Sequence, residues 1–522
     1  MEDLEKSFQH LDFENGGSDP DCLVISIDFG TTFSGVAYGF STDPSQVYCI
    51  TSWPGADGRK VPKAPTIIRY DDSEKTDFQW GYQLDPTSAD KIEGIKLLLD
   101  PEQPRPFYVP NGTEAEIDRL KNDVVKITSD DMRAIHQHAL KEIDTAYLAG
   151  YIESYKKRYV ISVPAVWSDK AKNLTLQAAR NAGISPVELI KEPEAAALYT
   201  LHCMKNKGLQ AGDAIVVCDA GGGTVDLISY EIISLRPFKV KEIVPCSGGL
   251  SGSLMLNRSF ERWIQETVGD AEYRQLKNTD GYRAAMQQFD LTVKPAFRSE
   301  KDRDRYLSFP MANLKDDHSK GIVRNAIKLK GTTLFNIFNP LFQDIHRLIT
   351  EQVHQVRTRR LRDRHPNGKA IKAILLVGGF GSSIYLREAI SASHPDIQVI
   401  QPNDAWSAIV KGGVLSMLPE EAVVVSNVAE KHYGTAGSRA YDPKRDQGQR
   451  LWMCEWKETL MCNTMEWFIH KDDELVRKDR ISINFYRQVA GHDPWGDSLV
   501  VQDYLYESIT SSAPVHRDKA AI

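Results

Sequence analysis

The chain has 522 residues, of which 41% are hydrophobic and 26% charged, and its formal net charge is −7. This length exceeds one ordinary domain, and the composition is that of a folded globular protein, which excludes the disordered and fibrous classes. The acidic balance gives no electrostatic reason to expect a nucleic acid or an anionic membrane as partner.

The N-terminal segment 1–21 is acidic and lacks an apolar stretch, so we expect a tail there and not a secretory signal. No run in the chain approaches the roughly 18 apolar residues that cross a membrane. The seven cysteines are dispersed without a C-x-x-C pair, which predicts neither a disulfide framework nor a zinc site. We therefore expect a reducing compartment, the cytoplasm or the nucleus.

Apolar strands alternate with amphipathic helices through most of the chain, and this alternation favours α/β layers. The clearest predicted strands are Leu23–Ile27, Tyr159–Val163, Ala214–Cys218 and Ile371–Val377. The clearest predicted helices are Asp169–Ala182 and Phe338–Val356, the second with an apolar stripe that we expect to face the core.

Two similar turns follow two of these strands. The first is Asp28-Phe-Gly-Thr-Thr32, and the second is Asp219-Ala-Gly-Gly-Gly-Thr-Val-Asp226. Glycine lets the backbone approach a phosphate group closely, while backbone N–H groups and threonine hydroxyls donate to its oxygens. One such turn alone is usually only a chain reversal. The pair predicts that a polyphosphate and its metal ion are held from two sides.

An arginine-rich run, 357–364, follows the long helix. It could suggest nucleic-acid binding, but aromatic residues are not interleaved and the protein is acidic. We interpret it as the solvated end of the helix, where positive charge complements the helix dipole.

From Pro419 onward the pattern changes to short alternating segments such as Ile481–Tyr486 and Ser498–Tyr504, separated by polar turns. This texture predicts a small β-rich domain at 420–522. No helix of lid length is visible among these residues.

The two turns and five further segments, in this order, resemble the actin-like ATPases and, within them, the 70-kilodalton heat-shock chaperones. The further segments are GIKLLLD (94–100), VISVPAVWSD (160–169), KEPEAAALY (191–199), GGLSGSLMLNRSF (248–260) and LLVGGF (375–380). The resemblance implies an actin-like, ribonuclease H-like α/β fold whose two ATPase lobes, 22–212 and 213–419, enclose a nucleotide cleft. It also implies that 420–522 is a truncated substrate-binding-like domain without a helical lid.

The same resemblance implies ATP or ADP with Mg²⁺ as the ligands. Mg²⁺ would be held through water by Asp28 and Asp219. The predicted catalytic residues are Lys96, beside the γ-phosphate, and Glu192 and Asp226, which orient the attacking water. The remaining nucleotide-binding residues would be Gly30, Thr31, Thr32, Phe33, Gly221, Gly222, Gly223, Thr224, Gly248, Gly249, Asp290, Lys294, Gly378 and Gly379.

Structural alternatives stand beside these roles. Lys96 could be a solvated helix lysine, Glu192 could only favour the start of a helix, and the glycine pairs could be ordinary turns.

The chain also departs from the family pattern. The segment Phe380-Gly-Ser-Ser-Ile-Tyr-Leu lacks the family's arginine, Asn403 stands at a usually acidic position, and the adenosine helix retains only Asp290 and Lys294. These features resemble the divergent A12-type and fungal members.

We therefore expect a chaperone that binds ATP, hydrolyses it slowly, and closes its lobes on nucleotide. Its partners would be a client protein at 420–522 and a co-chaperone or exchange factor. A nucleotide-dependent scaffold without turnover is the main alternative. A sugar kinase would need an aspartate beside a sugar pocket, which we do not find, and the β-rich tail disfavours a filament protein.

Overall fold

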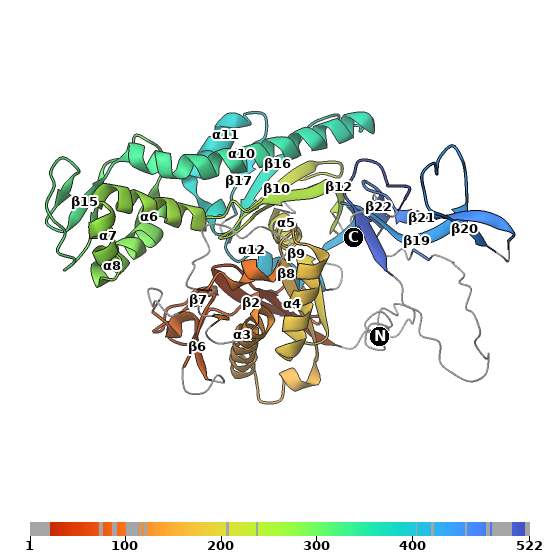
Figure 1. The fold of residues 1–522 in the computed structure, drawn as a ribbon. Coiled ribbons are helices and arrows are strands. Elements are labelled where there is room, and N and C mark those ends of the chain that lie inside the picture. The colour runs from red at the N-terminus through yellow and green to blue at the C-terminus, as the bar shows by residue number, and fades with distance from the viewer. Residues whose placement is uncertain are drawn as a thin grey trace.

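The computed structural model describes residues 21–71, 77–85, 91–100, 113, 117–118, 123–204, 208–235, 238–402, 404–418, 422–454, 457–476, 481–482 and 504–516. Within them the chain is mixed α/β, with two large sheets stacked on either side of a pair of helices (Figure 1). The predicted tail, Asn403 and most of the segments Ile481–Tyr486 and Ser498–Tyr504 lie outside these ranges.

The first large sheet is built around β1, whose residues are all buried. Its strands, in spatial order, are β3 (Tyr48–Cys49), β2 (Phe33–Phe40), β1 (Cys22–Asp28), β8 (Lys156–Val163) and β9 (Val187–Lys191), with β4 (Lys63–Pro65) also paired to β2. β1 runs parallel to β8 and antiparallel to β2, so a hairpin follows directly after Asp28. A continuous apolar run is typical of a strand covered on both faces. The predicted strands at 23–27 and 159–163 are confirmed.

The second large sheet repeats this pattern around β10. Its strand order is β17 (Gln398–Ile400), β16 (Ala373–Val377), β10 (Ala214–Ala220), β11 (Val225–Leu235), β12 (Phe238–Gly249), β18 (Ala422–Val428) and β22 (Glu474–Val476). β10 is parallel to β16 and antiparallel to β11, so a second hairpin follows Asp219. The predicted strand at 214–218 is confirmed, and the one at 371–377 begins two residues later, at Ala373.

Two helices separate the sheets. They are α5 (Glu192–Met204) and α12 (Ala408–Leu415), and they contact strands of both sheets and each other. A Cβ on Gly412 would lie 1.7 Å from the carbonyl oxygen of Ala195, so the two helices approach too closely for any larger residue. The small alanine residues of α5 therefore allow the two helices to pack closely.

The outer faces of the sheets carry the other helices. α3 (Val124–Ala146) and α4 (Asp169–Asn181) accompany the first sheet, while α6 (Leu254–Val268), α7 (Asp270–Leu276), α8 (Asp280–Gln288), α10 (Gly331–Arg362) and α11 (Ile384–Ser393) accompany the second (Figure 1). Ser168 caps α4 by accepting a hydrogen bond from the Ala171 N–H, which fixes its start at the predicted residue. Among the described helices, none is both long and apolar enough to span a membrane.

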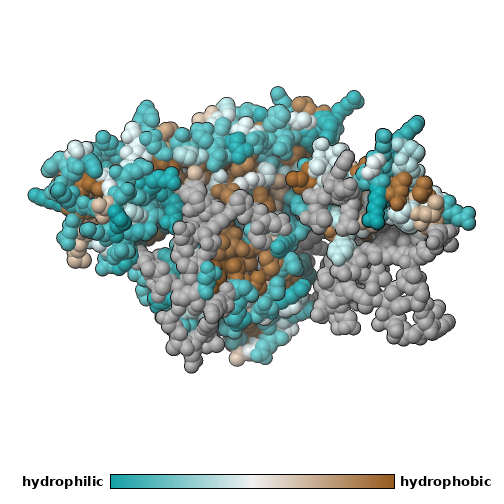
Figure 2. Space-filling view, viewed as in Figure 1, coloured by the Kyte–Doolittle hydropathy of each residue, from teal (hydrophilic) through white to brown (hydrophobic). Residues whose placement is uncertain are grey.

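The predicted helix at 338–356 is the central part of α10. Its apolar stripe is buried in the core of the second sheet, whereas its outward surface is hydrophilic (Figure 2). The arginine-rich run forms the last turns of this helix, up to Arg362, as predicted. Arg360 is an exception: it is 2% exposed and donates to the carbonyl oxygens of Gly212 and Gly368, so it fastens the helix end to a neighbouring loop.

Three smaller sheets complete the described chain. One joins β6 (Phe78–Trp80), β5 (Ile67–Tyr70) and β7 (Ile92–Glu93), and another joins β13 (Arg305–Ser308), β15 (Ala326–Leu329) and β14 (Ile322–Val323). The C-terminal sheet joins β20 (Leu451–Cys454), β21 (Thr459–Ile469), β19 (His432–Ala440) and β23 (Leu505–Ser508). The seven cysteines are all free.

The C-terminal part of the chain is β-rich, but it is divided between two sheets. β18 pairs in parallel with β12, and β22 pairs with β18, so both extend the second large sheet beyond residue 419. Three strands of the C-terminal sheet, β19, β20 and β21, lie between them in the sequence, and β23 follows β22. The domain limits at 212 and 419 stay predictions, and the sheet that β18 joins is the one assigned to the second lobe.

Candidate functional site

A cavity of about 270 Å³ lies where the hairpins of the two large sheets face each other. It gathers residues that are far apart in the sequence, from both turns and from several other segments. The predicted residues that line it are Asp28, Gly30, Thr31, Thr32, Phe33, Lys96, Glu192, Asp219, Gly221, Gly222, Gly223, Thr224, Asp290, Lys294, Gly378 and Gly379.

The two predicted turns touch across this cavity. A Cβ added to Gly222 would lie 2.6 Å from the Thr32 hydroxyl, and one added to Gly223 would lie 2.7 Å from the Thr31 hydroxyl. Both contacts are too short for a side chain, so the glycines permit the approach. Backbone N–H groups and threonine hydroxyls are thus concentrated at one place, as anion binding requires.

Lys96 and Glu192 form a buried ion pair at this place. Lys96 stands in a short 3₁₀ helix, η2 (Ile95–Leu99), and Glu192 is the first residue of α5. Lys96 is 3% exposed, which excludes the alternative of a solvated lysine. Burial raises the pKa of Glu192 to about 7, although the Lys96 ammonium opposes the rise. Glu192 can therefore exchange a proton near neutral pH.

The two strand-ending aspartates differ in their surroundings. Asp28 accepts from the Ser162 hydroxyl at 2.8 Å and from the Lys63 ammonium at 2.5 Å. Burial favours a higher pKa for Asp28, but the Lys63 and Lys96 charges outweigh it and lower that pKa. For Asp219, burial and the nearby carboxylates of Glu192, Asp226 and Asp28 raise the pKa well above its ordinary value.

The residues fit a hydrated Mg²⁺ ion at Asp219. Its buried Oδ1 atom has no hydrogen-bond partner among the described residues, and it faces the space beside Gly378. A Cβ on Gly378, which has φ +82°, would lie 2.2 Å from that oxygen, so this position favours glycine. In the described chain, no three His, Cys, Asp or Glu residues form a metal cage. Water and phosphate would have to supply the remaining ligands, as is usual for Mg²⁺.

The far end of the cavity carries both polar and apolar groups. Asp290 lies in a π-helical turn, η4 (Phe289–Val293), and pairs with Lys294 at the start of α9 (Lys294–Ala296). π-Helical turns are frequent at functional sites because they shift side chains out of the regular helical register. Leu291, Pro295 and Phe380 add apolar surface here.

Three predicted residues are not among the described residues that line the cavity. Asp226 pairs with Asp219 in the β10–β11 hairpin and accepts from the backbone N–H groups of Ala165 and Val166, at 2.8 Å and 3.2 Å. Burial raises its pKa, against hydrogen bonds from Thr224 and the backbone. Through these hydrogen bonds it supports the loop after β8.

Gly248 and Gly249, which were predicted to bind nucleotide, are not among the described residues that line the cavity. Both belong to β12, which continues to Gly249 because it is paired with β11. The segment instead reaches the cavity at Ser253, whose N–H donates to the Gly221 carbonyl. A Cβ on Gly252 would lie 2.1 Å from the Gly222 carbonyl oxygen. The loop after Gly249 therefore supports the second turn.

Lys63 and Trp406 are among the lining residues that were not assigned from the sequence. Lys63 reaches the cavity because β4 pairs with β2, and no sequence motif indicates this pairing. Trp406 lines the cavity, and its ring makes a T-shaped contact with the Phe33 ring at 5.4 Å between centroids. Only the position of Trp406 directly after the segment Gln401–Ala405 could have indicated a role for it.

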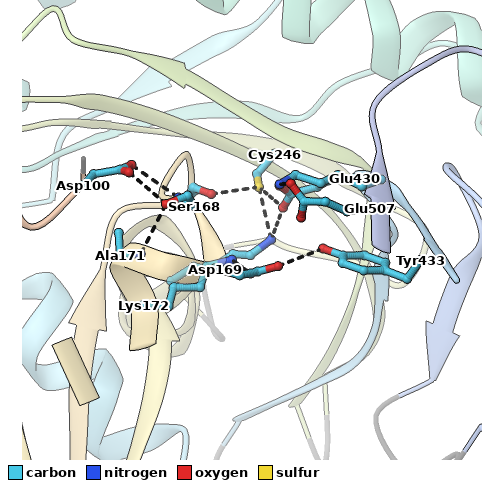
Figure 3. Close-up of polar contacts among 12 residues, drawn as sticks. Asp100, Ser168, Asp169, Ala171, Lys172, Cys246, Glu430, Tyr433 and Glu507 are labelled. Carbon is cyan, nitrogen blue, oxygen red and sulfur yellow. Dashed lines mark hydrogen bonds and ion pairs between the residues drawn. The ribbon is translucent and has the colours of Figure 1, made fainter. Parts of the chain in front are cut away.

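A polar junction connects residues of both large sheets with the chain that leads into the C-terminal sheet (Figure 3). Lys191, at the end of β9, donates to Glu430 at 2.6 Å and to the Cys246 sulfur at 3.1 Å. The Tyr433 hydroxyl of β19 reaches Asp169 of α4 at 3.4 Å. Since Lys191 directly precedes Glu192, this junction is one residue away from the cavity.

Comparison with known proteins identifies the class to which this fold and site belong. The family model described as Hsp70 protein matches residues 111–429, which is more than half of the chain. The chain belongs to the Hsp70 family, whose members are generally ATPases with an actin-like fold.

Within this family, divergent members are among the similar proteins. Human Heat shock 70 kDa protein 12A is 26% identical over 524 positions, covering 82% of this chain and 74% of the relative. Human Heat shock 70 kDa protein 12B is 24% identical over 483 positions, covering 75% and 68%. Chaperone protein DnaK of Thermosipho melanesiensis is 25% identical over 405 positions, covering 74% and 59%.

Proposed function

We propose that this protein binds ATP between two actin-like lobes and hydrolyses it slowly. The observation that carries the proposal is the contact between the two glycine-threonine turns across a cavity that also holds Lys96, Glu192 and Asp219. Each turn belongs to a different sheet, so a polyphosphate at this point would join the two halves. A small β-rich part, 420–522, would complete the proposed architecture.

We assign the residues as follows. The N–H groups and hydroxyls of the turns would hold the phosphate oxygens, and Lys96 would offset the charge that develops during transfer. Glu192, with its pKa near 7, would accept a proton from the attacking water, while Asp226 would fix the loop that positions it. Mg²⁺, held through water by Asp219, would supply further charge neutralisation.

The adenosine would lie toward Asp290, Lys294 and Gly379. The family arginine is missing there, and we propose that Trp406 and Phe380 supply the flat and apolar surface in its place. Aromatic contacts of this kind stabilise nucleobases by stacking, at about 1–3 kcal/mol per base.

We further propose that nucleotide closure of the lobes controls a chaperone-type interaction through 420–522. The support is the polar junction that links Lys191, Cys246 and Glu430 (Figure 3). Ligand binding can bias such an interaction only through a difference in affinity between open and closed states. The client, a co-chaperone and a cytoplasmic or nuclear location stay predictions.

A single-turnover assay with labelled ATP tests the ATPase proposal. We expect phosphate release that depends on Mg²⁺ and falls by about 100-fold or more in Lys96→Ala, because an ammonium beside the transferred phosphate is lost. The exposed Lys60→Ala serves as the matched control and should leave turnover unchanged. Equal phosphate release by the Lys96→Ala protein would refute the proposed chemistry.

Asp219→Asn tests the proposed metal role separately. The substitution replaces a buried carboxyl group, whose pKa is raised by burial, with a neutral amide. We therefore expect the variant to fold at least as stably as the parent. Turnover at a fixed Mg²⁺ concentration should fall by about 10-fold or more, because the carboxylate no longer orients the metal's water ligands. Unchanged turnover together with an unchanged Mg²⁺ titration would contradict the assignment.

A nucleotide-dependent scaffold without turnover is the second candidate. It is favoured by the Lys63–Asp28 pair, which engages a carboxylate that the resemblance assigns to the metal. The labelled-ATP assay separates the candidates, since a scaffold would bind the nucleotide and release no phosphate above the Lys96→Ala level.

A further inference from the structure

Lys63 is a buried cation in the cavity to which no role has been assigned above. It is 5% exposed, it lines the cavity, and its ammonium lies 2.5 Å from Asp28 Oδ2. A buried lysine is uncommon unless its charge is used or paired. Its position therefore calls for an explanation beyond chain packing.

The fold provides a built seat for this side chain. Lys63 pairs with Gly35 across the β2–β4 ladder, and a Cβ on Gly35 would lie 2.9 Å from Lys63 Cγ. The aliphatic stem thus crosses β2 where no side chain opposes it. The Tyr82 hydroxyl donates to the Lys63 carbonyl oxygen at 3.2 Å and fixes the backbone. As a result, the ammonium is directed into the cavity.

The charges that line the cavity are arranged in pairs. Lys63 pairs with Asp28, Lys96 with Glu192, and Lys294 with Asp290. Asp219 has no such ion pair among the described residues, which leaves it for the metal. Asp28 also accepts from Ser162, so it keeps a hydrogen bond if Lys63 turns toward another anion. Lys63 can therefore exchange a carboxylate oxygen for a phosphate oxygen without stranding Asp28.

The proposed function places a polyphosphate next to these pairs, and the inference rests on it. We propose that Lys63 is a second phosphate-binding lysine at the Asp28 side of the cavity, and that it reduces the dependence of nucleotide binding on Mg²⁺. An ammonium and a metal ion both neutralise phosphate charge, and a charge-assisted hydrogen bond can supply part of what the metal supplies. This chain would thus hold nucleotide by two lysines on one side and by a hydrated metal at Asp219 on the other.

Calorimetric titration with ADP, in excess Mg²⁺ and separately in EDTA, tests this role without any turnover. We expect the parent to bind ADP in EDTA within about 10-fold of its affinity in Mg²⁺. In Lys63→Gln, the affinity in EDTA should fall by a further factor of about 10 or more, and the affinity in Mg²⁺ by less than about 3. Lys60→Gln, at an exposed lysine in the loop before β4, should match the parent in both conditions.

The outcomes separate this inference from the proposed function. If Lys63→Gln binds ADP as the parent does in EDTA, or loses the same factor with and without Mg²⁺, the role of Lys63 is overturned while nucleotide binding stands. If the parent fails to bind ADP even in excess Mg²⁺, the proposed function fails, and the inference fails with it.

A second pair of variants covers the case in which Lys63→Gln does not fold because the buried Asp28 carboxylate loses its cation. Asp28→Asn frees Lys63, so we expect it to bind ADP in EDTA at least as tightly as the parent. Adding Lys63→Gln to Asp28→Asn should weaken that binding by about 10-fold or more. Equal binding by the single and double variants would overturn the proposal.

Discussion

Several buried side chains of this protein are titratable, and their surroundings set their pKa. Glu242 is one that is not among the described residues lining the cavity. It lies on β12, is 1% exposed, and accepts from the Val428 N–H at 3.0 Å. Burial raises its pKa to about 7, although Lys191 and that N–H oppose the rise. The folded state therefore binds this proton more tightly than the unfolded chain, whose value is near 4.5.

The sign of the pH dependence follows from this difference. The contribution of Glu242 to the free energy of unfolding is largest below pH 4.5 and is lost as the pH rises toward 7. Glu242→Gln cannot ionise, so above pH 7 it should be more stable than the parent by up to about 3 kcal/mol. Denaturant unfolding at acidic and at alkaline pH measures this, with the exposed Glu466→Gln as control. A variant that loses stability with pH as steeply as the parent would disprove it.

At the level of single residues, the sequence predicted those that stand in compact motifs. Asp28, Thr31, Thr32 and Asp219 follow buried strands directly, so local geometry decides where they lie. Lys63 and Trp406 were not assigned, because long-range pairing brings them to the cavity: Lys63 through the β2–β4 ladder, and Trp406 through the chain before α12. No spacing rule in the sequence reports such pairings.

Among the elements, the two turns are the ones on which the site depends. Gly222→Ala would place a Cβ 2.6 Å from the Thr32 hydroxyl and 2.8 Å from its methyl carbon. The turns could then meet only if they moved apart, so we expect ADP affinity to fall by about 10-fold or more, with little change in Tm. Fluorescence titration measures the affinity, since Trp406 lines the cavity.

Gly437→Ala on β19 serves as the matched control for the loss of a glycine. A Cβ there would meet only a side-chain oxygen of Glu466, at 3.9 Å, so ADP affinity should not change. If Gly222→Ala also bound ADP like the parent, the contact between the turns would not be needed for nucleotide binding.

The strands and helices themselves were largely predictable, and β18 shows where that ends. Its residues read as the start of a separate β-rich region, because the sequence texture changes near residue 420. The strand nevertheless pairs in parallel with β12, whose matching residues lie more than 180 positions earlier. Pairing partners at such separations are decided by the packing of the whole sheet, and a single sequence carries little information about them.

For the whole molecule, hydrogen bonds among Lys191, Cys246 and Glu430 join both large sheets to the chain just before the C-terminal sheet; Cys246 and Glu430 are labelled in Figure 3. The Lys191 charge helps to lower the Glu430 pKa against the effect of burial. Lys191→Met would remove this charge and leave the Glu430 carboxylate without its cation. We expect local opening to become easier by about 1–3 kcal/mol. Hydrogen exchange of the backbone around 430–433 should therefore become faster by about 10-fold or more.

An exposed pair on the second large sheet provides the control. Lys241 and Glu474 join β12 and β22 with side chains that are 39% and 43% exposed, so Lys241→Met should change exchange little. Equal exchange rates in Lys191→Met and the parent would show that apolar packing alone holds the C-terminal sheet.

β18 and β22 attach both ends of the segment that carries β19, β20 and β21 to the second large sheet. The chain leaves the second large sheet after Val428 and returns to it at Glu474, and the two strands are paired with each other. A protease cut in the loop between β19 and β20 would therefore leave two fragments that remain associated by backbone hydrogen bonds. Gel filtration would still show one particle, and only a denaturing gel would reveal the nick.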